Sequence, residues 1–349
     1  MGLTLRLRGE TVAGVEPVQT GFACRDVAGL AASRPLEEAL AIVERTCSLS
    51  HEAHRLALSM AVERATGAKP TPAAEQTRLV FAECERILAR LWTLAQVSRA
   101  AGLPIPFGDA LEQRETLFDA LQTATGRRHY WAVAVPGGVR EGLDLTPLAT
   151  TIEEIEAALP QWRKQVAPNG PLAVAGKGAG VITAERAKTL GLTGIAAAGS
   201  YEAEDLRRAR PYGAYAGMST QLEGGSRLRG GDAAARLVCI VEDLAVSLTL
   251  VREASAALNG ATPEVPAEAT GAQPAAGALV SEAAEGPHGP VEIAAALSGD
   301  GEALAQLRLS APGAEALVAA LPGLLEGCRL SQAAVIVASL DLCVECLDT

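Results

Sequence analysis

The feature that most constrains this fold is the run 72–102, in which apolar side chains recur every three to four positions. That spacing places them along one side of an α-helix of about eight turns. Such a helix needs long partners, and the stretches 109–126 and 232–258 have the same period. Aromatic residues make up only 3% of the chain, whereas Ala, Leu and Gly are abundant. The sequence therefore predicts long helices packed closely through small side chains.

Short β-structures are predicted near both ends of the chain. Residues 3–17 alternate apolar and polar side chains around a Gly9-Glu10 turn, and residues 290–310 do so around a Gly-Asp-Gly turn. We expect an α+β fold, mainly α: a helical bundle core with small peripheral β-sheets at the N-terminal and C-terminal ends. Its 349 residues are expected to form a single domain, 1–349. Residues 259–280, rich in Ala, Pro and Gly without any period, are predicted to be a flexible loop.

Charge and hydropathy exclude several classes of function. The net charge of -11 gives nucleic acid or an anionic membrane no attractive surface, so no nucleic-acid partner is expected. The sequence contains no apolar run of about 18 residues, the length that a membrane span requires. The first ten residues are too charged for a signal peptide. We therefore expect a cytoplasmic protein whose seven scattered cysteines are reduced thiols.

The Cys-x-x-Cys pair formed by Cys343 and Cys346 is the sharpest chemical motif. A zinc ribbon would need a second such pair, and a redox-active pair would need a helix after its first thiol. Two thiolates at this spacing can still bind one soft metal ion if other residues complete the site. Cys47 is a natural candidate. His51 and His54 lie close to it in the chain, although histidines bonded to backbone or water are the favoured interpretation there.

Short motifs at opposite ends of the chain match parts of one pattern. The segment 45–54, RTCSLSHEAH, follows the pattern R-x-C-G-x-C-x-x-x-H with Ser50 at the second cysteine position. The segment 341–349, DLCVECLDT, follows D-P-C-x-x-C, and EGPHG at 285–289 follows E-x-P-R-G. In these motifs the chain resembles the large-subunit family of nickel–iron hydrogenases and its relative, the 49-kilodalton subunit of respiratory complex I.

The resemblance implies roles for individual residues. Cys47 and Cys343 match terminal nickel ligands, and Cys346 matches a thiolate that bridges nickel and iron. Ser50 replaces the other bridge, and a hydroxyl is a poor substitute for a bridging thiolate. His288 stands where the family has an arginine beside the iron. The residues that the resemblance places around these ligands are Arg45, Ser50, His54, Glu285 and His288.

A large-subunit fold with an incomplete ligand set resembles the HupK or HoxV type of hydrogenase maturation protein. This resemblance implies a non-catalytic scaffold that carries an Fe(CN)2CO fragment transiently, with nickel as the second possibility. The implied partners are a HypC-type chaperone and hydrogenase subunits. Catalytic members also carry a cleavable tail after the last motif, which we do not expect here. The alternatives are an unusual catalytic nickel–iron large subunit and a degenerate complex I-like oxidoreductase subunit.

Overall fold

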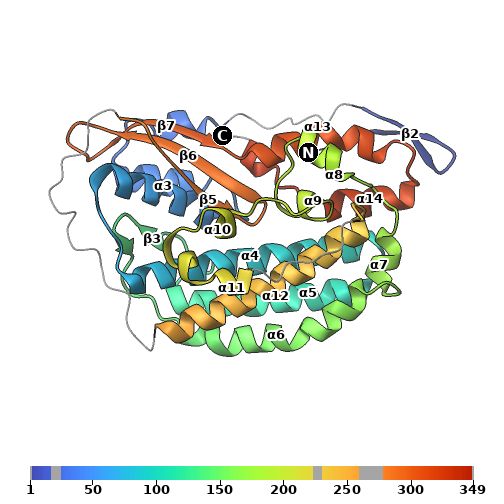
Figure 1. Ribbon diagram of the computed structural model, residues 1–349, viewed down its shortest axis with the longest axis horizontal. Coiled ribbons are helices and arrows are strands. Elements are labelled where there is room, and N and C mark those ends of the chain that lie inside the picture. Colours follow the sequence, from blue (N-terminus) through green and yellow to red (C-terminus); the bar gives the residue numbers. More distant parts are fainter. Residues whose placement is uncertain (1, 17–24, 223–229, 259–277, 348–349) are drawn as a thin grey trace.

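A bundle of long helices forms one half of the molecule (Figure 1). The computed structural model describes residues 2–16, 25–222, 230–258 and 278–347. The members of the bundle are α4 (Pro72–Ala100), α5 (Pro104–Thr125), α6 (Thr146–Val166) and α12 (Ala233–Ala257). Helix α4 packs against α5 and α12, and α6 packs against the same two helices. Leu and Ala dominate the buried contacts, with a few large rings such as Phe81 and Trp162. The predicted helical core is confirmed.

Local chemistry explains where these helices begin and end. Thr71 and Asp232 cap α4 and α12, because their side-chain oxygens accept hydrogen bonds from the amides of Ala74 (3.2 Å) and Ala235 (2.8 Å). Gly126 follows α5 with φ of 71°, a left-handed conformation that glycine adopts without strain. Helix α5 begins at Pro104, earlier than the period of the sequence predicts, because proline is well suited to a first helical turn.

Small antiparallel sheets lie outside the bundle. Strands β1 (Leu5–Arg8) and β2 (Thr11–Val15) form the predicted N-terminal hairpin, and β3 (Ala134–Val135) pairs with β4 (Gly138–Val139). The C-terminal sheet has the order β5-β6-β7. Its strands are β5 (Val280–Gly286), β6 (Gly289–Leu297) and β7 (Leu304–Ser310).

Strand β5 corrects the sequence prediction in two respects. The sequence SEAAEG that it contains is poor in β-branched residues, so its composition does not indicate a strand, and pairing with β6 decides its conformation. The loop predicted at 259–280 also extends too far, because Val280 already belongs to β5. Residues 259–277 lie outside the described part of the chain.

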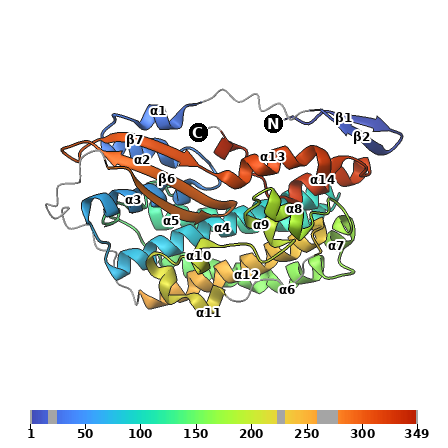
Figure 2. The same cartoon turned by 45° about the horizontal axis from the view of Figure 1, so that its top comes forward.

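A second hydrophobic core lies between this sheet and the helices that precede the bundle in the sequence. Helices α2 (Leu36–Glu44) and α3 (His51–Thr66) bury their apolar side chains together with those of β6 and β7, and α1 (Val27–Ala31) packs beside α2. Figure 2 shows the sheet and α3 as a layer above the bundle. Of the described helices, none is both long and apolar enough to cross a bilayer.

The stretch between α6 and α12 contains short helices. They are α7 (Pro171–Gly176), α8 (Ala184–Thr189), α9 (Gly194–Ala198), α10 (Leu206–Ala209), η1 (Gly213–Gly217) and α11 (Ser219–Leu222). The chain closes with α13 (Pro312–Leu325), α14 (Leu330–Ser339) and the turn η2 (Glu345–Leu347). The last segments bring the C-terminal thiols back to the loop between α2 and α3.

Candidate metal centre

Three thiols from opposite ends of the chain meet in one buried cluster. The Sγ atom of Cys343 is 3.2 Å from that of Cys47 and 3.8 Å from that of Cys346, and all three lie within 4.8 Å of one another. Leu49 and Ala311 pack against them. The structure therefore brings together the three cysteines that the sequence motifs singled out. We call these residues the thiol cluster.

Polar contacts hold the two chain ends together at this point. The Arg25 guanidinium donates hydrogen bonds to the carbonyl oxygens of Thr46 (2.9 Å) and Glu345 (3.0 Å). The Glu345 carboxylate accepts from both the amide (2.5 Å) and the hydroxyl (2.8 Å) of Ser48. Because these contacts tie the loop after α2 to the segment after α14, they fix the separation of Cys47 from the terminal pair.

Hydrogen bonding within the cluster makes its three sulfur atoms inequivalent. Bonds from Cys346 and Cys47 hold the pKa of the Cys343 thiol well below its usual range, despite burial. The same bonds to Cys343 raise the pKa values of Cys47 and Cys346. Hydrogen bonds from the two neighbouring thiols thus favour the thiolate form of Cys343, and thiolate is the form of cysteine that binds metals.

Asp341 links the thiol cluster to the bundle. The residue lies just after α14 with φ of 55°, a strained conformation for a side chain that is not glycine. Its buried carboxylate accepts hydrogen bonds from Arg90 and Thr93 of α4. His288, in the turn between β5 and β6, contacts it through Nδ1, 2.9 Å from the carbonyl oxygen and 3.2 Å from Oδ2. These contacts hold the chain in the turn that leads to Cys343.

The Asp341–His288 pair also sets the charge beside the cluster. Burial lowers the pKa of His288, but the Asp341 carboxylate outweighs it, so that the pKa is raised overall. Burial raises the pKa of Asp341, but His288 and Arg90 outweigh it in the opposite direction. Each partner therefore favours the charged form of the other.

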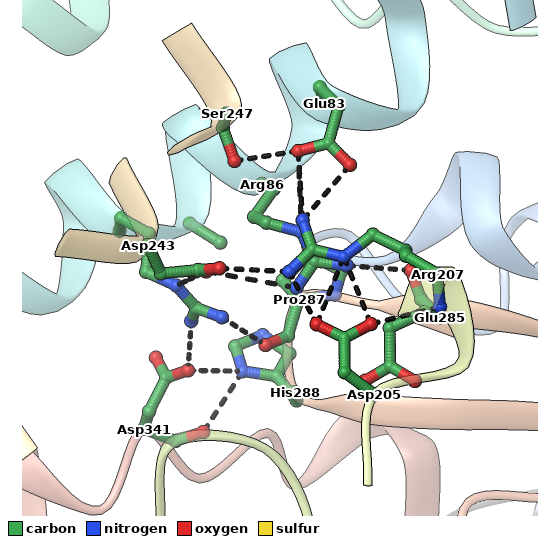
Figure 3. Close-up of polar contacts among 12 residues, drawn as sticks. Glu83, Arg86, Asp205, Arg207, Asp243, Ser247, Glu285, Pro287, His288 and Asp341 are labelled. Carbon is green, nitrogen blue, oxygen red and sulfur yellow. Dashed lines mark hydrogen bonds and ion pairs between the residues drawn. The ribbon is translucent and has the colours of Figure 1, made fainter. Parts of the chain in front are cut away.

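A buried network of arginines and carboxylates extends from this pair across α4, α10 and α12 (Figure 3). Arg207 donates to both oxygens of Glu83 (3.1 Å each) and to Asp243 (2.9 Å), and Arg90 donates to Asp243 (2.7 Å). The arginines of the network are Arg86, Arg90 and Arg207; its carboxylates are Glu83, Asp205 and Asp243, with Asp341 at its edge. Since buried charges are stable only when paired, this network fixes Arg90 and, through it, Asp341.

The sequence motifs do not identify this network. Its signal is the pair Arg86 and Arg90, which occur on the buried side of the longest predicted helix. Arginine is almost never fully buried without a partner, so such residues in a buried helix indicate carboxylates elsewhere in the fold. Apart from Glu83 of α4 itself, the carboxylate partners of Arg86 and Arg90 come from α12 and from the segment after α14, and helical periodicity carries no information about these.

Ser50, at the position of the missing thiol, is the buried residue preceding α3. Its side chain makes no N-capping hydrogen bond. The carboxylate of Glu85 on α4 caps this helix instead, by accepting from the amides of Glu52 (2.7 Å) and Ala53 (3.2 Å). The Ser50 hydroxyl is therefore not needed for the helix start.

The remaining predicted site residues lie in different surroundings. His54 contacts the Ser50 carbonyl through Nδ1 (2.7 Å), which agrees with the favoured interpretation of a histidine bonded to backbone. The exposed guanidinium of Arg45 donates to the Ala41 carbonyl (2.6 Å) and lies over the Trp131 ring. Glu285 accepts from the Leu206 amide (3.0 Å). These contacts are with backbone and ring groups rather than with thiols.

The thiol cluster fits one soft metal ion. Three sulfur ligands about 2.3 Å from a tetrahedral ion lie about 3.8 Å apart, close to the separations observed here. The set does not fit a nickel–iron pair held by four thiolates, because Ser50 offers a hydroxyl at the matching position. Cys47, Cys343 and Cys346 would hold a single ion, with one position left for another ligand.

A cavity of about 820 Å³ borders the site. Its walls are largely apolar and come from β1, α4 and α14, with Trp92 and Leu330 among them. His288 and Asp341 contribute its polar end, and Leu49, which packs on the thiol cluster, also lines it. A small molecule in this cavity would reach the polar pair beside the thiols.

Comparisons with known proteins agree with this architecture. Residues 102–275 match the family model described as respiratory-chain NADH dehydrogenase, 49 Kd subunit. The carbon monoxide-induced hydrogenase of Rhodospirillum rubrum is 26% identical over 352 aligned positions, covering 100% of this chain and 95% of that protein. Sequence similarity to this relative therefore extends from one end of the chain to the other.

A further relative is the NADH dehydrogenase [ubiquinone] iron-sulfur protein 2 of Nephroselmis olivacea, 29% identical over 72% of this chain. The chain spans only 63% of the length of that relative. A chain of the membrane-bound sulfane sulfur reductase, an archaeal respiratory membrane complex, has the same fold, with a TM-score of 0.85 and 24% identity. The alignment covers 99% of this chain and 94% of that one.

Proposed function

The chain is a relative of complex I 49-kilodalton subunits and nickel–iron hydrogenase large-subunit-like proteins, and from that premise we propose a role as a subunit of a membrane-associated oxidoreductase. In this role it carries one soft metal ion on Cys47, Cys343 and Cys346. Its partner is an iron–sulfur subunit of the same complex. Similarity to hydrogenase and complex I subunits favours this role over that of a maturation scaffold.

The observation that carries the proposal is the meeting of three buried thiols from residues 47, 343 and 346. Thiols that serve only as packing groups have no need to converge, whereas these lie at separations suited to one ion. Contacts between Arg25, Ser48 and Glu345 hold the cluster closed, which keeps the cost of organising the ligands low when metal binds.

Residues around the cluster define what the protein contributes to such a centre. A thiolate-bound metal ion supplies Lewis acidity or a redox couple. The charged network holds Asp341, and Asp341 orients His288 beside the sulfur atoms. A His288 side chain with a raised pKa can hold a proton next to the centre, and burial of the three thiols limits their access to bulk water. The protein would thus bind the metal ion through its thiols, orient His288 through Asp341, and hold a proton on His288.

The test is to purify the chain together with its co-expressed neighbouring subunits and to measure metal by mass spectrometry. We expect about one equivalent of a soft metal ion per chain and stable association with an iron–sulfur subunit. The variant Cys346→Ala should lose the ion, whereas Cys328→Ala should keep it, because Cys328 is a partly buried thiol outside the cluster. Equal metal content in both variants would refute the role of the thiol cluster.

A second candidate is the maturation scaffold for an Fe(CN)2CO fragment. Ser50 in place of a bridging cysteine favours it, because three thiols can hold an iron fragment without locking a bimetallic site. In this case the chain is not an enzyme, and its partners are a HypC-type chaperone and a hydrogenase large subunit. Cyanide and carbonyl infrared bands in protein purified with the maturation proteins would support the scaffold. Their absence, with hydrogenase maturation intact in Cys346→Ala, would exclude it.

A further inference from the structure

A second group of metal-ligating side chains lies at the start of α3. Glu44 at the end of α2 and His51 and Glu52 in the first turn of α3 present donor atoms that all lie within 4.8 Å of one another. All three residues are buried, and Glu52 is fully excluded from solvent. Carboxylate and imidazole donors differ in chemistry from the nearby thiols, so the two groups suit different ions.

Two of these residues have metal-ligating atoms without a hydrogen-bond partner among the described residues. Neither the carboxylate oxygens of Glu52 nor the Nδ1 atom of His51 has a hydrogen-bond partner among the described residues. Buried polar groups are nearly always satisfied, so an unsatisfied carboxylate at full burial indicates a missing ligand. The hydroxyl of Tyr130, whose ring lies 4.5 Å from that of His51, is also unsatisfied. The polar atoms that lack partners thus gather at one place.

The third residue is already held in position. One oxygen of Glu44 accepts a hydrogen bond from the Ala132 amide (2.6 Å), and the other accepts from Arg55 (3.4 Å). Arg55 also donates to the Ala134 carbonyl, which keeps its guanidinium at the edge of the group. A ligand that is fixed before metal arrives raises affinity, because less conformational entropy is lost on binding.

Charge around the group favours a cation. Glu85, which caps α3, places a third carboxylate oxygen 3.8 Å from His51 Nδ1. Arg55 pairs with Glu44, and Arg78 and Arg86 also act electrostatically on Glu52 and Glu85. Burial nevertheless outweighs these arginines and raises the pKa values of all three carboxyl groups. Negative charge in a region of low dielectric is costly unless a counterion or protons neutralise it. A divalent ion would neutralise it and would satisfy the orphaned atoms of Glu52 and His51 at once.

We propose that Glu44, His51 and Glu52 form a second metal site, for a divalent ion of the Mn²⁺ class that accepts oxygen and imidazole ligands. Ligands about 2.1 Å from an octahedral ion lie about 3 to 4.2 Å apart, so small side-chain rotations bring the observed donors into range. The half-buried Trp131 ring stacks on His51, with ring centroids 5.7 Å apart.

Mn²⁺ is the probe that separates this site from the thiol cluster, because thiolates bind that hard ion weakly. The experiment titrates the purified full chain with Mn²⁺ and follows the electron paramagnetic resonance signal of the free ion. We expect one Mn²⁺ per chain. The variants Glu52→Gln and His51→Gln should each lower the affinity by about tenfold or more.

Matched controls distinguish this site from the thiol cluster and from general acidity. Cys346→Ala should bind Mn²⁺ like the wild type, and so should Glu75→Gln, which changes a carboxylate in the first turn of α4 rather than α3. Circular dichroism verifies folding, and the His51 variant gives the same test if the Glu52 variant does not fold. Absence of Mn²⁺ binding by the wild type at millimolar concentration, or unchanged binding in both site variants, would overturn the proposal and leave a protonated, water-filled cluster.

Discussion

Replacement of Asp341 by Asn tests how the charged network supports the thiol cluster. Asn keeps the size of the side chain and tolerates the left-handed backbone at this position, so the change removes mainly charge. Arg90 keeps Asp243 as a partner (2.7 Å), and the Asn oxygen can still accept a hydrogen bond. What is lost is the charge-assisted part of the contacts with Arg90 and His288.

The expected loss of stability in Asp341→Asn follows from the burial of the Asp341 carboxylate. Removing one partner of a fully buried pair costs about 3 to 5 kcal/mol, and a hydrogen bond to a charged group contributes about 1.5 to 3 kcal/mol. Because Arg90 retains a carboxylate and Asn retains an acceptor, we expect the free energy of unfolding to fall by about 2 to 3 kcal/mol. The assay is urea unfolding of metal-free, reduced protein, followed by circular dichroism.

The pH dependence supplies a second, independent check. The pKa of His288 is raised above its ordinary 6.5, so its contribution is complete below about pH 6.5 and disappears as pH rises through the raised value. The pKa of Asp341 is lowered from 3.8, so its contribution is present above that value and is lost as pH falls through the lowered one. The pair therefore stabilises most between about pH 4 and 6.5, and Asp341→Asn should cost more at about pH 5.5 than at about pH 8.5.

Asp300→Asn is the control, because Asp300 is a carboxylate in an exposed turn. It should leave the unfolding midpoint almost unchanged. A loss below about 0.5 kcal/mol for Asp341→Asn, or an equal loss at both pH values, would refute the account of the network.

Further variants test the closure of the site and its supports. Arg25→Ala should expose the terminal thiols, and faster alkylation of Cys343 in the native protein would show it. Glu83→Gln should lower the free energy of unfolding by about 3 kcal/mol in urea, because this buried carboxylate pairs with Arg207 and Arg86. Gly194→Ala should lower the melting temperature more than Gly191→Ala does: both glycines have positive φ, but only at 194 would a Cβ lie 2.9 Å from a backbone oxygen, in the turn at residue 288.

Much of the fold could be predicted from the sequence, because the regular spacing of apolar residues identifies long helices. The run 72–102, the stretch 232–258 and the hairpin around Gly9 correspond closely to α4, α12 and the β1–β2 pair. Strand β5 could not be predicted in this way, because its conformation depends on pairing with β6 rather than on its own composition.

The thiol cluster could be predicted only by joining motifs at the two ends of the chain. Periodicity does not state that Cys47 lies near Cys343; the family resemblance implied it, and the structure places their sulfur atoms 3.2 Å apart. The sequence does not indicate Glu44 and Glu52 as candidate metal ligands, because each looks like an ordinary acidic residue of an amphipathic helix. Their burial depends on the sheet and on the loop at 130–132, which are distant in sequence.

The central claim is that Cys47, Cys343 and Cys346 bind one metal ion together. Its most direct test is titration of the reduced protein with Co²⁺, read by the sulfur-to-cobalt charge-transfer absorption that only thiolate ligands produce. The account predicts one Co²⁺ per chain with this absorption, and a weaker band in each of the three single Cys→Ala variants but not in Cys328→Ala. Titration without a charge-transfer band, or with a band that the three variants leave intact, would contradict it.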